Sequence, residues 1–169
     1  MELTQIVDFL MVEHSLIRGI GKCIAGEAGP EFSDFREYVK SCHIEIEEKL
    51  VFPVIIESLP ESSLDVSVRV KQIQADHKLL LKLSENIDNW ISQGNSRLLG
   101  ERGPLYIRLL KEHNQNEDSF VFKLWPHADQ DSNSKIKREA MAIIENFGLK
   151  RYLEITGISM ELYEKFMEK

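Results

Sequence analysis

The sequence predicts an all-α fold, an up-down-up-down four-helix bundle followed by a short helical C-terminal extension. Apolar residues recur at helical spacing along almost the whole chain, and no stretch has the sustained alternation of a strand. Four segments of about 20 or more residues are separated by short breaks that contain Gly, Pro or Ser. Long helices joined by short connections are typical of such bundles.

The composition narrows the class of protein. The chain has 169 residues, 43% of them hydrophobic, which is enough for one core. Its 21 basic and 28 acidic residues give a net charge of −7, without a block of basic residues, so nucleic-acid binding is disfavoured. No apolar run spans a bilayer, no export signal is recognisable, and Cys23 and Cys42 are too few for a disulfide scaffold. We expect a soluble, cytoplasmic protein that binds neither nucleic acid nor membrane.

The first two helices are predicted from their stop and start signals. The first covers about residues 4–25 and ends at the Gly- and Pro-containing sequence 26–30. The second begins near Ser33, a candidate N-cap, and carries its apolar pattern to Pro53. Because proline lacks a backbone donor, we expect a kink or a last helical turn there.

The next two helices follow from the same signals. The third covers about residues 64–92 and closes at Gly94-Asn95-Ser96. The fourth begins at Pro104, which suits a first helical turn, and ends at Trp125-Pro126.

The remaining residues continue with shorter helices. Residues 136–147 form a predicted helix with Gly148 as its C-cap, and Ser159 caps a final helix through Phe166. We therefore place the bundle at residues 1–127 and the C-terminal extension at residues 128–169. The extension packs either on the bundle or on a partner, such as a second copy of the chain in a homodimer.

Histidines are the most informative residues of the chain. Four of the five fall one on each predicted long helix, each within the apolar stripe of that helix, and therefore point toward the bundle axis: His14, His43, His77 and His113. His127 follows Pro126 in a loop and is not expected to bind a metal.

Two of the axial histidines are followed by a glutamate four residues later, His43 by Glu47 and His113 by Glu117. One helical turn, about 6 Å, separates the members of each pair and places them on the same inner face. The two segments share a longer pattern of His, three variable positions, Glu, an acid, one variable position, a bulky apolar residue, Val and Phe. An internal repeat is therefore visible.

Each half of this repeat also begins with an acid and a histidine, in Glu13-His14 and Asp76-His77. Two helical hairpins related by a pseudo-twofold axis would thus bring four imidazoles and two carboxylates to one buried place. Residues one apart face different ways on a helix, so we expect the acids adjacent to these residues to be solvated charges. They are Glu13, Glu48, Asp76 and Asp118.

Two buried carboxylates need a compensating charge. Each would cost several kcal/mol in an apolar core, and no Lys or Arg lies near them on the apolar stripes. Two divalent metals, each bound by two imidazoles and bridged by both carboxylates and an oxygen from water, would supply that charge. Mixed imidazole and carboxylate donors suit iron, or manganese or cobalt, better than a structural zinc.

With this order of residues, the chain resembles the hemerythrin-like (HHE cation-binding) proteins over residues 3–126. The resemblance extends to the endings Val51-Phe52-Pro53 and Leu124-Trp125-Pro126. It implies a four-helix bundle with two non-haem iron ions, joined by a bridging oxo or hydroxo group, that meet O2, NO or peroxide. It assigns metal ligation to six residues: His14, His43, Glu47, His77, His113 and Glu117.

One departure from the family pattern bears on function. Hemerythrins that carry oxygen reversibly have a further histidine one turn away on the third helix, where this chain has Ile73 and Leu81. One iron would lack an imidazole, which leaves both irons open to a small molecule. The remaining donor set is similar to that of di-iron proteins implicated in repair of nitrosatively damaged iron centres, and of hemerythrin-like proteins that decompose peroxide.

We therefore predict a di-iron protein that binds or reacts with O2, NO or peroxide, in sensing, detoxification or iron handling. The two open positions favour turnover over reversible binding. The alternatives are a ferritin-like oxidase or peroxidase, an iron-donating repair protein, and a non-enzymatic helical interaction module.

Overall fold

The computed structural model describes residues 5–17, 31–58, 64–126 and 130–168. Within these ranges the chain is almost entirely helical and forms no strand, so the predicted all-α fold is confirmed. The end of the first predicted helix, Cys23 and His127 lie outside the described residues.

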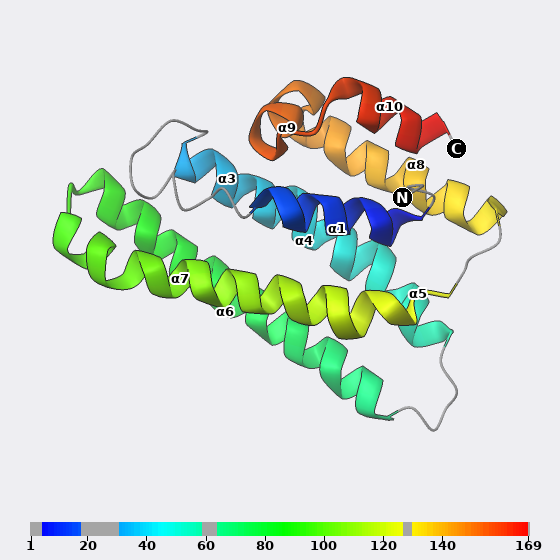
Figure 1. Ribbon diagram of the computed structural model, residues 1–169, viewed down its shortest axis with the longest axis horizontal. Helices are drawn as coiled ribbons and strands as arrows, with labels where there is room; N and C mark the ends of the chain where they lie inside the picture. The colour runs from blue at the N-terminus through cyan, green and yellow to red at the C-terminus, as the bar shows by residue number, and fades with distance from the viewer. Residues whose placement is uncertain (1–4, 18–30, 59–63, 127–129, 169) are drawn as a thin grey trace.

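Four helical segments run alternately up and down in chain order and form the bundle (Figure 1). The first is α1 (Ile6–Ile17), and the second joins α3 (Phe32–Tyr38), α4 (Ile44–Ile46) and α5 (Phe52–Glu57). The third is α6 (Leu64–Ser92), as predicted, and the fourth is α7 (Ser96–Asn116).

Wider π-helical turns interrupt the second and fourth segments. They are η1 (Val39–His43), η2 (Glu47–Val51) and η3 (Glu117–Val121), and a 3-10 turn, η4 (Phe122–Leu124), follows η3. Both η2 and η3 start at the glutamate of a His-x3-Glu pair. Their C-terminal residues also share a backbone conformation, with φ −88° and ψ −53° at Val51 and φ −89° and ψ −53° at Val121. The internal repeat therefore extends from the sequence to the backbone, and single π-turns of this kind are frequent at functional sites.

One predicted N-cap and one predicted helix start are wrong. The second segment begins at Phe32, with Glu31 at the N-cap and no side-chain cap, instead of being capped by Ser33. The fourth begins at Ser96, and Pro104 lies inside it. Asn95 explains the earlier start, because its side chain accepts a hydrogen bond of 3.2 Å from the Leu98 backbone and caps the helix.

Other breaks lie where they were predicted. Gly94 adopts φ +64° in the turn between α6 and α7, a conformation that glycine tolerates. Pro53 lies in the first turn of the short helix α5, directly after η2, where its missing N–H costs little. The last turn of the fourth segment ends at Leu124, and Trp125 leaves the helical region with ψ 117°.

The C-terminal extension contains three helices, α8 (Gln130–Phe147), α9 (Leu149–Thr156) and α10 (Met160–Glu168). Gly148, with φ +107°, separates α8 from α9, and the Ser159 hydroxyl accepts a bond of 3.2 Å from the Leu162 N–H at the start of α10. The caps at Gly148 and Ser159 are thus confirmed, whereas α9 was not predicted.

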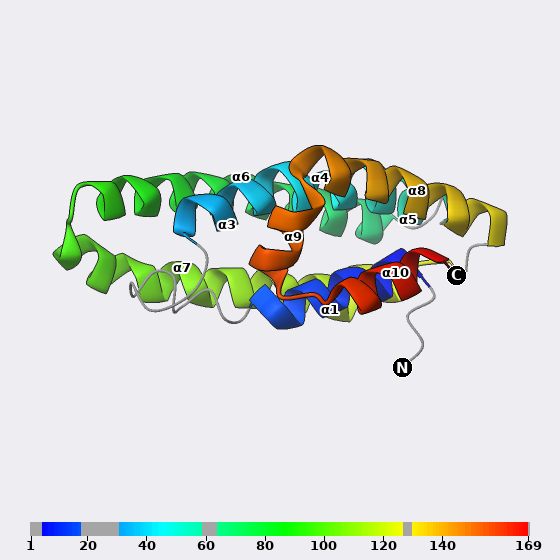
Figure 2. The same ribbon diagram turned by 90° about the horizontal axis from the view of Figure 1, so that it is seen from above.

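The extension packs along the first half of the bundle. In Figure 2, α6, the α3–α5 segment and α8 lie in one layer, α7, α1 and α10 lie in another, and α9 crosses between them. Phe166 stacks on Phe9 of α1 with ring centroids 4.4 Å apart, and Arg151 of α9 donates to Asp34 of α3. Helix α10 therefore packs on α1, and α9 packs on both α1 and α3.

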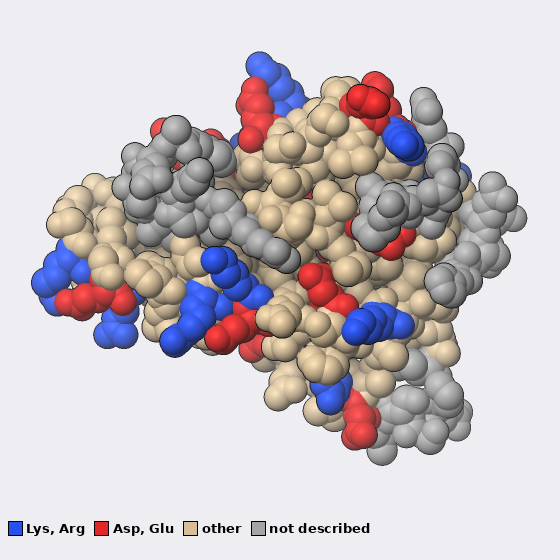
Figure 3. Space-filling model, in the orientation of Figure 1, with Lys and Arg blue, Asp and Glu red and all other residues tan. Residues whose placement is uncertain are grey.

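The described surface mixes charges of both signs. On the face shown in Figure 3, basic and acidic side chains lie interspersed. The pairs Arg97–Glu101 and Arg108–Glu112 follow the exposed side of α7 at i,i+4 spacing. None of the described helices combines the length and the apolar character that crossing a membrane requires.

Candidate metal centre

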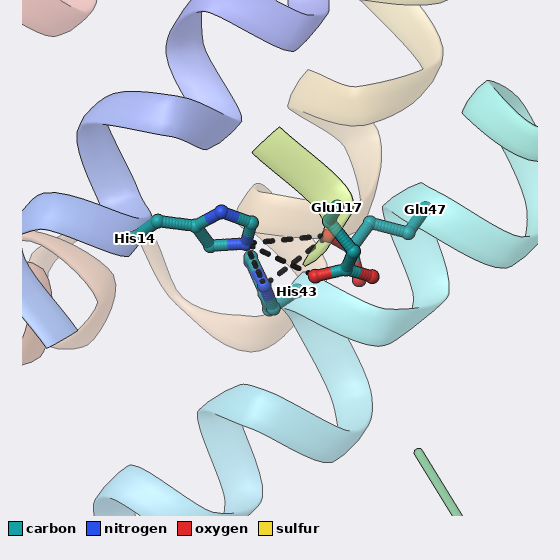
Figure 4. Close-up of side chains that lie close together, drawn as sticks. All are labelled: His14, His43, Glu47 and Glu117. Atoms are coloured by element: carbon teal, nitrogen blue, oxygen red, sulfur yellow. Dashed lines mark hydrogen bonds and ion pairs between the residues drawn. The ribbon is translucent and has the colours of Figure 1, made fainter. Parts of the chain in front are cut away.

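All six predicted ligands lie together in the middle of the bundle, and each is at most 5% exposed. They come from all four helical segments, so the tertiary fold assembles the cluster. Figure 4 shows four of them, His14, His43, Glu47 and Glu117, with imidazole nitrogens and carboxylate oxygens directed toward a common point. The side chains that the sequence places on one axis are therefore brought together.

Each carboxylate lies between imidazoles of both hairpins. Glu47 Oε1 is 3.3 Å from His43 Nε2 and 3.5 Å from His14 Nε2, whereas its Oε2 is 3.3 Å from His77 Nε2. The two oxygens of one carboxylate thus face two different groups of imidazoles, which is the arrangement that a bridging ligand requires.

Glu117, from the other hairpin, also contacts imidazoles of both groups, although here one oxygen faces an imidazole of each group. Its Oε1 is 3.2 Å from His77 Nε2, and its Oε2 is 3.3 Å from His113 Nε2 and 3.5 Å from His14 Nε2. Two overlapping groups of donor atoms result, each with all atoms within 4.8 Å of one another: His14, His43, Glu47 and Glu117 in one, and His77, His113 and Glu117 in the other. Either group could hold a metal ion.

The buried carboxylates lack ordinary hydrogen bonds. Neither oxygen of Glu47, nor Oε2 of Glu117, has a hydrogen-bond partner among the described residues. Such groups are costly to bury unless a cation compensates them. The orphaned oxygens face the space between the imidazoles, so the donors fit a cation.

Without a metal, protons supply part of this charge. Burial alone would lower the pKa of His14, but the carboxylates of Asp118, Glu47 and Glu117 outweigh it and raise the pKa to about 10. Glu117 and Glu47 likewise outweigh burial at His77 and raise its pKa to about 11. Burial dominates at His113 and lowers its pKa. The carboxylates thus favour positive charge inside the cluster.

Two of the acids next to the predicted ligands support histidines of the opposite hairpin. Asp118 Oδ1 is 2.8 Å from His14 Nδ1, and Glu48 Oε1 is 2.8 Å from His77 Nδ1. A neutral imidazole that donates its Nδ1 proton to a carboxylate presents the Nε2 lone pair to a metal. The prediction that these acids are solvated charges is wrong. A residue one position along a helix does point away from the ligand face. At Glu48 and Asp118, however, that direction leads to a neighbouring helix of the bundle and not only to solvent.

The acids that precede the single histidines differ from one another. Glu13 is fully buried, and its Oε2 lies 2.7 Å from His43 Nδ1, so the solvated-charge prediction is also wrong for Glu13. Asp76 is 47% exposed, and its Oδ2 is 4.0 Å from His113 Nδ1, beyond hydrogen-bond distance. Only Asp76 is the exposed charge that was expected.

Two tyrosines complete the surroundings of Glu13, and sequence reasoning missed both. The Tyr38 hydroxyl donates to Glu13 Oε2 at 2.6 Å, and the Tyr152 hydroxyl donates to Oε1. Burial and the Glu13 carboxylate raise the pKa of both phenols well above the ordinary value. Tyr152 lies 139 residues from Glu13 in α9, and no local pattern pairs residues so far apart.

Comparison with known proteins agrees with this geometry. A family model described as the hemerythrin HHE cation-binding domain matches residues 5–125. The chain belongs to the hemerythrin HHE family. No curated protein and no solved structure matched the chain in the same comparisons. The match covers the bundle and all six candidate ligands, whereas Tyr152 lies outside it.

Membership of the hemerythrin HHE family implies that the chain binds a metal cation, and the His/Glu cluster is where it could do so. On α6, Ile73 is buried one turn before His77, and Leu81 is partly buried one turn after it. Neither side chain has a donor atom. Within the described residues, the hemerythrin-like cluster therefore has four imidazoles and two carboxylates.

The cluster also has a repeated aromatic wall. Phe52 stacks on His77 with ring centroids 6.0 Å apart, and Phe122 stacks on His14 at 5.6 Å. Both phenylalanines occupy the last position of the repeated sequence pattern. They hold the rings of the single histidines in place and keep water from that side of the cluster.

Proposed function

We propose that the protein is a non-haem di-iron protein that binds or reacts with O2, NO or peroxide at this cluster. Two irons would be held by His14, His43, His77 and His113, with Glu47 and Glu117 shared between them. The observation that carries the proposal is the position of the two buried carboxylates, each of which lies within 3.5 Å of imidazoles of both groups. One metal would leave part of each carboxylate uncompensated.

The donor set favours iron among the available metals. Imidazole nitrogen and carboxylate oxygen together suit iron, manganese and cobalt. Among the described residues, neither group of donor atoms includes a cysteine, which a structural zinc site often has. When bound, the irons would supply one-electron chemistry and an open coordination position for a small ligand.

The protein's own groups would control that chemistry. The six side chains exclude bulk water, and the stacked rings of Phe52 and Phe122 close one side of the single histidines. The carboxylates of Asp118 and Glu48 orient His14 and His77. Ile73 stands where a further imidazole could bind one iron. Both irons would therefore have a coordination position open to a small ligand, which favours reaction over reversible carriage.

Metal analysis tests the proposal. Protein purified from iron-replete cells should contain about two irons per chain. The double variant Glu47→Gln/Glu117→Gln should lose most of the iron, because neutral amides neither compensate nor bridge two cations. Glu45→Gln is the matched control, since Glu45 lies on the same helix but pairs with Lys49 at the surface. Equal iron contents in all three proteins would overturn the proposal.

Titration of the reduced protein with O2, peroxide or NO separates binding from turnover. A spectral change that reverses when the ligand is removed indicates a carrier or sensor. Oxidation of the iron with consumption of O2 or peroxide indicates an oxidase or peroxidase. The proposal is contradicted if none of the three ligands changes the spectrum of the iron-loaded protein.

A further inference from the structure

The two halves of the cluster are related by sequence, but their histidines do not have equivalent carboxylate partners. Each half contributes a histidine preceded by an acid, in Glu13-His14 and Asp76-His77, and each acid faces the Nδ1 of the paired histidine in its own half. The distance is 2.7 Å from Glu13 to His43 but 4.0 Å from Asp76 to His113. His113 Nδ1 is buried and has no hydrogen-bond partner among the described residues. Three of the four imidazoles thus have a carboxylate partner, and the fourth does not.

The length of one side chain accounts for part of the difference. Aspartate is one methylene shorter than glutamate, so Asp76 does not reach as far as Glu13 does from the equivalent position. The rest is due to the surroundings, since Glu13 is fully buried and Asp76 is about half exposed. A water-exposed carboxylate has weaker interactions with a buried imidazole than a desolvated one has.

Two phenols, one from the bundle and one from the C-terminal extension, contribute to that difference in surroundings. Tyr152 of α9 and Tyr38 both donate to Glu13, which fixes the carboxylate that supports His43. Tyr38 lies five residues before His43. The residue five positions before His113 is Arg108, whose exposed side chain points to Glu112. Asp76 therefore lacks the phenol that its counterpart Glu13 receives from the second segment.

A cavity adjoins the unsupported histidine. Its volume is about 110 Å³, and its lining includes His113, Asp76, Glu112 and Asn116. Leu79, Leu80 and Leu109 form the rest of its lining. A cavity of about 450 Å³ likewise adjoins His14, so the two positions differ in the support of their imidazoles and not in the presence of a neighbouring cavity.

We propose that the two metal positions are unequal. The position at His77 and His113 exchanges its ion, whereas the position at His14 and His43 retains its ion because Tyr152 and Glu13 hold His43 in place. Tyr152 is thus a positioning residue of the metal centre that lies outside the hemerythrin domain. This inference rests on the proposed function, since it requires two bound metals.

Release kinetics test the inference. Protein loaded with Fe²⁺ without oxygen is mixed with an excess of a ferrous chelator, and the absorbance of the chelate is followed. The wild-type protein should release its iron in two phases, about one ion in each. Lengthening the acid in Asp76→Glu should slow the fast phase about tenfold, because an outer carboxylate is worth about 10- to 100-fold in metal affinity.

Two matched variants examine the retained position. Tyr152→Phe should speed the slow phase and leave the fast phase unchanged. Tyr163→Phe is the control, because Tyr163 is another buried tyrosine of the extension whose hydroxyl has no hydrogen-bond partner among the described residues. Equal effects of the two substitutions would show that Tyr152 acts only through packing and would overturn its positioning role.

The outcomes separate this inference from the proposed function. The inference is overturned if both ions leave at one common rate in the wild-type protein and in the variants Asp76→Glu and Tyr152→Phe. That result would leave the di-iron proposal intact. A wild-type protein that never binds more than one ion would overturn the di-iron proposal, and the inference with it.

Discussion

Metal binding should displace protons from the cluster in a countable amount. The carboxylates raise the pKa values of His14 and His77 to about 10 and about 11, so both imidazoles are protonated at pH 8 when no metal is bound. A metal takes the nitrogen that holds each proton. Adding Mn²⁺ to the metal-free protein at pH 8 should therefore release about two protons per chain from these residues. His43, whose pKa is also raised, adds a further fraction.

Unperturbed histidines would release far fewer protons on metal binding. With the ordinary pKa of about 6.5, each imidazole carries about 0.03 proton at pH 8, so four would release only about 0.1 in total. The release from His14 and His77 should also stay near two between pH 7 and pH 9, because both pKa values lie above this range. Ordinary histidines would release several-fold fewer protons at pH 8 than at pH 7.

Calorimetry in two buffers of different ionisation enthalpy counts the protons, and an indicator dye in weak buffer gives an independent value. Glu45→Gln serves as the control, since it changes one acid of the same helix at the surface and should leave the count unchanged. Release of fewer than about 0.5 protons per chain at pH 8 would refute the electrostatic reasoning for the cluster.

Three further predictions concern stability. The raised pKa values of His14 and His77 stabilise the metal-free fold fully below the unfolded pKa of about 6.5, and this contribution is lost as the pH rises through about 10 and 11. The melting temperature of metal-free protein should therefore fall from pH 7 to pH 9, and a rise would contradict this sign. Ile144→Ala should cost about 2–5 kcal/mol in urea unfolding, because Ile144 of α8 is fully buried; a loss below about 1 kcal/mol would show that α8 is not packed as described. Arg151→Ala should cost less than about 1 kcal/mol, since the pair with Asp34 is more than a third exposed, and a cost above about 2 kcal/mol in the same assay would contradict this estimate.

The sequence was sufficient for the bundle and for the six cluster residues because both depend on local periodicity. Histidine and glutamate four residues apart share a helix face, so His43 with Glu47 and His113 with Glu117 could be assigned to the axis before any tertiary contact was known. The repeat then indicated that both pairs meet. Their meeting in the structure follows from that duplicated register.

Features that depend on packing between distant segments could not be predicted in this way. The acids Asp118 and Glu48 support histidines of the other hairpin, and spacing along one helix gives no information on that pairing. Tyr152 contacts Glu13 because α9 packs against both α1 and α3. Asn95 does carry a local signal, since it is a good N-cap, but Pro104 further along the chain also suits a first helical turn and competes with that signal.

In the proposed di-iron centre, Glu47 and Glu117 share two metal ions between them. Anomalous diffraction at the iron edge from crystals of the iron-loaded protein tests it most directly. We predict about two iron peaks per chain, both within bonding distance of the two carboxylates and each beside one pair of imidazoles. A single peak, or peaks away from Glu47 and Glu117, would contradict a shared pair of metal ions.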